Sequence, residues 1–210
     1  MYKEQDNQHL LDAYEIRLRE AAEGIKDDMY RNIACNALQR LDYLTLLRMS
    51  PYQLEGTLAH QGGLLVYTVH LVEATAALAK ACHEVDGSID RSFLTLASMF
   101  YMVGWNTTTT IINDNIKRRD AFITTGIERS GFRFMHDLLQ HVESDLGLGI
   151  PEERKQALGD IYGDPHTLEG NIIKQAGRTI DIILFAEENA ATRKGNWSPD
   201  HHGFFVGHHS

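Results

Sequence analysis

The segment GGLLVYTVHLVEATAALAKAC, residues 62–82, decides the fold of this chain. Its apolar residues cover most of a helical circumference, and only His70, Glu73 and Lys80 interrupt them with strongly polar side chains. A helix that is apolar on nearly every side has to be covered by other elements. The pattern therefore predicts a central helix over residues 63–84, and the polar interruptions argue against a membrane span.

Helical periodicity continues on both sides of this segment, which predicts an all-α fold. Apolar residues recur at helical spacing over residues 9–21, and a second helix is expected over 27–48, ended by Ser50 and Pro51. The Thr- and Asn-rich residues 105–127 are expected to form a loop or a short hairpin. Further helices are expected over 92–103, 128–146, 151–162 and 166–189.

The length of 210 residues is enough for one sizeable core with additions at its ends. We divide the chain into an N-terminal helical extension (1–50), a helical domain (51–189) and a flexible tail (190–210). The second and third parts meet where large apolar residues become rare.

The formal net charge of −9 argues against general nucleic-acid binding and against binding to anionic membranes. The two cysteines, Cys35 and Cys82, each sit in an apolar helical pattern and are expected to be small core residues. The first ten residues are polar and hold no apolar signal region. These features predict a cytoplasmic protein without a membrane segment.

Three stretches resemble the motifs of the HD superfamily of metal-dependent phosphohydrolases. Residues 62–67, GGLLVY, resemble the family's first motif, in which Gly-Gly-Leu-Leu is followed by a metal-binding histidine. Residues 97–105, ASMFYMVGW, resemble the second motif, in which a helix ends in His-Asp before an apolar residue and glycine. Ala176-Gly177-Arg178 resembles the last motif, Ala-Asp-Arg. The resemblance covers about residues 55–187 and implies an HD-like helical bundle, similar to the HD domains associated with exoribonucleases and with relaxases of mobile elements.

All four positions that hold the metal in that family differ here: Tyr67 and Tyr101 stand for histidines, and Met102 and Gly177 for aspartates. A hard divalent ion needs imidazole nitrogens and carboxylate oxygens at about 2.0–2.2 Å. Neutral tyrosine is a poor ligand, methionine is soft, and glycine has no side chain. Without the metal there is no activated water. We therefore expect a catalytically inactive protein that acts by binding and needs no cofactor.

The resemblance implies that Tyr67 and Tyr101 converge, and two interpretations of this pair stay open. The phenols either plug the former metal cavity as core residues, or line a pocket that holds a nucleotide or another phosphate-containing ligand without hydrolysing it. The candidate pocket residues are His60, His70, Trp105, His136, His141, Lys174, Arg178 and Asp181.

An alternative is a phosphohydrolase with a site rebuilt around His60, His70, His136, His141 or Asp181, and only this reading requires a divalent metal. The tail histidines His201, His202, His208 and His209 are weak candidates for a transition-metal site. A third hypothesis is a structural interaction module that uses the N-terminal helices. Their apolar stripes favour a protein partner or a homodimer.

Overall fold

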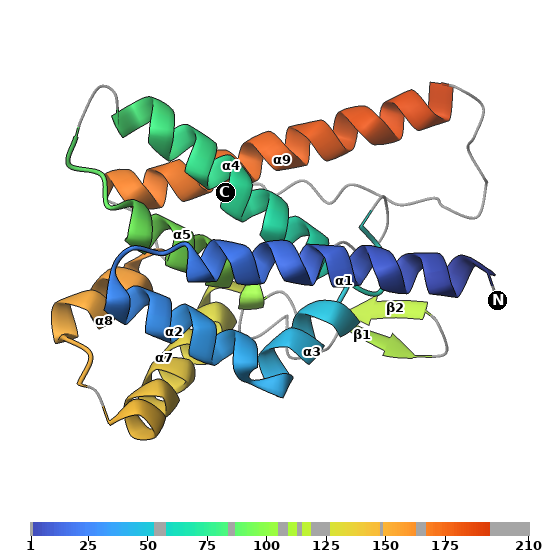
Figure 1. The fold of residues 1–210 in the computed structure, drawn as a ribbon. Helices are drawn as coiled ribbons and strands as arrows, with labels where there is room; N and C mark the ends of the chain where they lie inside the picture. The colour runs from blue at the N-terminus through green and yellow to red at the C-terminus, as the bar shows by residue number, and fades with distance from the viewer. Residues whose placement is uncertain are drawn as a thin grey trace.

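The protein has an all-α fold, and its described residues include a short hairpin, as seen in a computed structural model (Figure 1). The structure describes residues 2–52, 58–83, 87–104, 109–112, 115–118, 127–147, 149–162 and 167–193. Within these ranges the helices are α1 (Tyr2–Glu23), α2 (Asp28–Gln39), α3 (Leu41–Met49), α4 (Gly63–His83), α5 (Arg91–Phe100), α7 (Ile127–Leu146), α8 (Glu152–Asp160) and α9 (Leu168–Arg193). Strands β1 (Thr109–Ile112) and β2 (Asn115–Arg118) pair antiparallel. The prediction of an all-α fold is confirmed.

Helix α4 lies at the centre of the fold, as its sequence predicts. It packs against α5 and α9 over long stretches and against α1 and α3 over shorter ones. Leu64, Leu65 and Leu71 on this helix are 0% exposed. By length and composition alone α4 is long and apolar enough to cross a membrane, which the sequence-based expectation had excluded. However, 56% of the apolar stretch of α4 is buried inside the protein. Burial of this kind is what an apolar core helix requires.

The N-terminal helices contribute to the same core as α4. Leu18 of α1, Ile33 of α2, and Tyr43 and Leu47 of α3 are each at most 1% exposed and belong to one hydrophobic cluster with α4, α5 and α9. Figure 1 shows α1 running across the molecule in front of α4, and the two helices are in contact. The apolar stripes of α1 and α2 are thus largely covered within one chain. The division of the chain into an extension (1–50) and a helical domain (51–189) stays a prediction.

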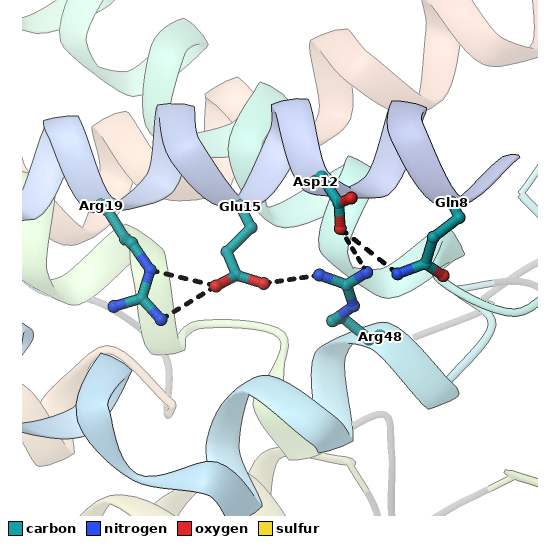
Figure 2. A network of polar contacts seen from close by, with 5 residues as sticks. All are labelled: Gln8, Asp12, Glu15, Arg19 and Arg48. Atoms are coloured by element: carbon teal, nitrogen blue, oxygen red, sulfur yellow. Dashed lines mark hydrogen bonds and ion pairs between the residues drawn. The ribbon is translucent and has the colours of Figure 1, made fainter. Parts of the chain in front are cut away.

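A polar network fastens α1 to α3 at the edge of this core (Figure 2). The guanidinium of Arg48 donates to Glu15 at 2.6 Å and to Asp12 at 2.7 Å, and Arg19 donates to Glu15 from the next turn of α1. Partial burial of Glu15 opposes its ionisation, but the hydrogen bonds from Arg48 and Arg19 outweigh burial and lower its pKa. The network holds α3 in place against α1.

One predicted helix is wrong: the segment 27–48 forms two helices that are separated at Arg40. The backbone of Arg40 is extended, with φ −72° and ψ 117°, so the chain changes direction between α2 and α3. The change lets Tyr43 turn inward, where its hydroxyl donates to the carbonyl of Met99 at 2.7 Å. Packing against α5 therefore overrides a helical period that is continuous in the sequence.

The remaining boundaries differ from the predictions by a few residues. Pro151 is the N-cap of α8 rather than part of its first turn, and Glu152 follows it at the positive end of the helix. Helix α9 continues to Arg193, past the expected end at residue 189. The predicted hairpin lies at 109–118, and residues 194–210 lie outside the part of the chain that the structure describes.

Candidate functional site

The glycine pair at the start of α4 is explained by close packing. Gly62 has φ +86°, a conformation that favours glycine, and a Cβ atom there would lie 2.3 Å from Cδ2 of Leu11. A Cβ atom on Gly63 would lie 2.0 Å from the carbonyl oxygen of Leu58. The same carbonyl accepts a hydrogen bond from the backbone N–H of Tyr52 at 3.1 Å. The motif thus brings the segment that carries Tyr52 against the first turn of α4.

Tyr52 and Tyr67 stack in the interior beside α9. Their ring centroids are 3.6 Å apart with an interplanar angle of 14°, and Tyr67 is 1% exposed. The hydroxyl of Tyr52 donates to Oδ1 of Asp181 at 3.0 Å, and that of Tyr67 donates to the carbonyl of Gly177 at 3.4 Å. We call these four residues, Tyr52, Tyr67, Gly177 and Asp181, the tyrosine cluster.

Gly177 leaves the space that the phenol of Tyr67 occupies. A Cβ atom on Gly177 would lie 3.3 Å from the Tyr67 hydroxyl, which is tighter than an ordinary contact, and 4.0 Å from Cδ1 of Leu71. The two positions that the HD resemblance assigns to metal ligands on separate motifs are therefore in direct contact. The aromatic ring of Tyr67 itself takes up the space beside Gly177.

The environment keeps both phenols neutral. Burial raises the pKa of Tyr67, and the carboxylate of Asp181 and the phenol of Tyr101 raise it further, whereas the hydroxyl of Tyr52 acts in the opposite direction. Burial also raises the pKa of Tyr52, with Tyr67 and Asp181 adding to the effect. Neutral phenols donate hydrogen bonds to Asp181 and Gly177, and they do not supply the phenolate oxygen that a metal would need.

Tyr101 and Met102 follow the last turn of α5 and are half-buried against the core. Tyr101 is close enough to Tyr67 for its phenol to influence the pKa there. The carbonyls of the last turn of α5 are satisfied by buried tyrosines, because Tyr162 donates to Phe100 at 2.6 Å just as Tyr43 donates to Met99. The end of the second motif is thus fixed by phenols from α3 and from the end of α8.

His70, one turn after Tyr67, points toward α1 and not toward the tyrosine cluster. Its Nε2 lies 3.3 Å from the hydroxyl of Tyr14, and the two rings meet edge to face. Arg17 and Glu73 form an ion pair beside them. Partial burial lowers the pKa of His70, against the opposing effect of Glu73. His70 therefore belongs to the contact between α1 and α4.

The other candidate histidines are not brought together with it. His60 is exposed, and its Nδ1 lies 2.8 Å from the carbonyl of its neighbour Gln61. His136 and His141 pair with acidic residues of their own helix, Asp137 at 3.6 Å and Asp145 at 3.0 Å. These partners identify them as histidines of the surface of α7.

Across the described ranges no group of three His, Cys, Asp or Glu residues could hold a metal ion. On α9, Lys174 is half-buried and Arg178 is exposed. Trp105, His201, His202, His208 and His209 lie outside the described residues. At the four family positions the donor set is two phenols, a thioether and a glycine. These residues do not fit the divalent metal that the resemblance implies.

The sequence pointed to Tyr67, Gly177 and Asp181 but missed Tyr52, Tyr43 and Tyr162. Tyr52 follows Pro51 in a non-helical segment, so no helical period marks it as buried. The signal that could have identified it is the close approach required by Gly63, which brings the preceding segment against α4.

Comparisons with known proteins give no match: no family model, curated protein or solved structure matches the chain. The HD resemblance rests on the three motifs alone.

Proposed function

We propose that this chain is an HD-like helical protein that lacks metal-dependent catalysis and acts by binding, as a regulatory or accessory protein. One observation carries the proposal. The ring of Tyr67, 1% exposed and stacked on Tyr52, fills the space next to Gly177, where the resemblance requires metal ligands. The link to mobile elements, like the cytoplasmic location, follows from sequence alone and stays a prediction.

The burial of Tyr67 also bears on what the protein binds. A pocket for a nucleotide or phosphate needs accessible donors, whereas Tyr67, 1% exposed, donates to Gly177 inside the protein, and the buried Tyr52 already donates to Asp181, an exposed residue of α9. The structure thus favours the plug over the phosphate pocket at this position. A binding role then has to use the outer surface, and a protein partner is the class that suits it best.

A substrate screen tests the loss of catalysis. Nucleotides, cyclic nucleotides and short oligonucleotides are incubated with the protein and with Mn²⁺, Ni²⁺ or Mg²⁺, each against the metal alone. We expect no turnover above that blank, because the residues that the structure describes hold no set of ligands for a metal that could activate water. Metal-dependent turnover that Asp181→Asn or His70→Gln abolishes would instead establish the alternative of a rebuilt phosphohydrolase site.

A converse experiment tests the placement of the HD motifs. The variant Tyr67→His, Tyr101→His, Met102→Asp, Gly177→Asp restores the family's ligands and should gain affinity for a divalent ion that the parent lacks. Calorimetric titration with Mn²⁺ measures this, and circular dichroism checks that the variant folds. A folded variant that binds no metal would show that the motifs are misplaced on this chain.

A further inference from the structure

A groove between α7 and α8 is separate from the tyrosine cluster and has the features of a binding surface. Its volume is about 410 Å³, within the range of roughly 300–1,000 Å³ that is typical of ligand sites. Met135 and Leu139, 1% and 4% exposed, form its apolar floor. Phe132 at one end is 48% exposed, which is unusual for a large aromatic side chain.

The packing of α7 on α8 fixes the position of this aromatic ring. A Cβ atom on Gly159 would lie 2.8 Å from Cε2 of Phe132, so the ring rests on the last turn of α8. At the neighbouring contact a Cβ atom on Gly131 would lie 2.3 Å from Cε1 of Tyr162. The two glycines let the helices approach closely at this end and hold Phe132 against Gly159, the neighbour of Asp160 in the chain.

The rim of the groove is acidic. Three carboxylates line it, Glu143, Glu152 and Asp160, against the single ammonium of Lys155. Lys155 is already paired with Glu143 at 2.8 Å, and Glu143 also accepts from the backbone N–H of Ile150. Glu152, 87% exposed, lies at 4.0 Å from Lys155. The rim therefore presents uncompensated negative charge, and His136 is its remaining titratable side chain.

We propose that this groove binds a basic, amphipathic segment of a partner protein, with an Arg or Lys side chain over Phe132 and beside Asp160. Three effects favour a cation there: the face of the aromatic ring, the carboxylate, and the carbonyl end of α8. The aliphatic side chains of the segment cover Met135 and Leu139. The net charge of −9 attracts such a partner over a longer range.

Two matched tripeptides test the inference: acetyl-leucyl-leucyl-arginine amide, and the same peptide with citrulline, an uncharged isostere of arginine. Each is titrated into the ¹⁵N-labelled full chain, and amide shifts are followed by NMR. We expect saturable shifts in α7 and α8 with the arginine peptide. We expect the citrulline peptide to bind about fivefold more weakly, or more weakly still.

Variants locate the site. Phe132→Ala and Asp160→Asn should each weaken binding of the arginine peptide by about fivefold, and Glu152→Gln by about twofold, because the Glu152 side chain is 87% exposed and solvent screens its charge. Asp137→Asn is the matched control, since this side chain is 82% exposed on α7 and does not line the groove. The inference is overturned if neither peptide gives saturable shifts in α7 and α8. Equal affinity of the parent protein for the two peptides would also contradict it. So would equal affinity of Asp160→Asn and Asp137→Asn for the arginine peptide.

Discussion

At the scale of single residues, Tyr67 and Gly177 form a complementary pair, because the phenol of one occupies the space that a side chain on the other would need. Tyr67 is 1% exposed, whereas Tyr101 is half-buried. Truncation of a buried aromatic residue typically costs about 3–5 kcal/mol of the free energy of unfolding. We therefore expect Tyr67→Ala to lose about that amount and Tyr101→Ala on the order of 1 kcal/mol. Urea denaturation measures both losses, and a loss of only about 1 kcal/mol for Tyr67→Ala would contradict a buried plug at Tyr67.

A double-mutant cycle tests the contact itself. Alanine is favoured over glycine inside a helix by about 1 kcal/mol, but in the parent a Cβ atom on Gly177 would lie 3.3 Å from the Tyr67 hydroxyl. Gly177→Ala should thus change the parent's stability little and stabilise Tyr67→Phe by about 0.5–1 kcal/mol. Denaturation of the four proteins measures this coupling. The same effect in both backgrounds would mean that the hydroxyl and Gly177 do not compete for space.

At the scale of elements, Asp27 joins α2 to α8. Its Oδ1 caps α2 by accepting from the N–H of Tyr30 at 3.0 Å, and it accepts from Arg154 at 2.8 Å. The hydrogen bond from Arg154 lowers the pKa of Asp27 below its ordinary 3.8. A lowered pKa in the folded state contributes stability that is complete above the unfolded-state pKa and is lost as the pH falls through the folded value.

Asp27→Asn keeps the cap and removes the charge. We expect it to be less stable than the parent by about 0.5–1 kcal/mol at pH 7. The difference should begin to shrink below about pH 4, where the carboxylate of the unfolded chain becomes protonated, and disappear at lower pH, where the folded carboxylate is protonated too. Thermal unfolding of both proteins between pH 7 and pH 3 measures this. A difference that does not change with pH would exclude the charged pair as its cause.

The elements also show what a sequence can predict. The helix at α4 and the order of the others follow from apolar periodicity, which depends on local spacing. The break at Arg40 could not be predicted, because apolar residues continue at helical spacing through Leu41, Leu44 and Leu47. What separates α2 from α3 is packing of Tyr43 against α5, a contact between residues 56 positions apart. The same distinction holds for the candidate site. Tyr67 lies in a recognisable motif and could be predicted, whereas its stacking partner Tyr52 lies outside any motif and could not.

At the scale of the whole molecule, α9 offers a surface for self-association. Ile182, Ile183 and Phe185 on this helix are 67%, 52% and 48% exposed. We expect a homodimer at micromolar concentration, the commonest symmetric assembly, and a shift to monomer in Ile182→Lys. Light scattering coupled to size exclusion measures the mass. A parent protein that is monomeric under these conditions would contradict this prediction. It would leave the account of the tyrosine cluster unchanged.

The central claim is that a buried tyrosine occupies the place of a metal, and metal binding tests it most directly. The measurement is a calorimetric titration of untagged protein with Mn²⁺ and Ni²⁺, together with its metal content as purified. A matched variant with His201, His202, His208 and His209 changed to alanine removes any contribution of the tail. The account predicts that this variant carries no stoichiometric metal and gives no saturable heat with either ion. A stoichiometric transition metal retained by that variant, and lost on mutation of Asp181 or His70, would contradict it.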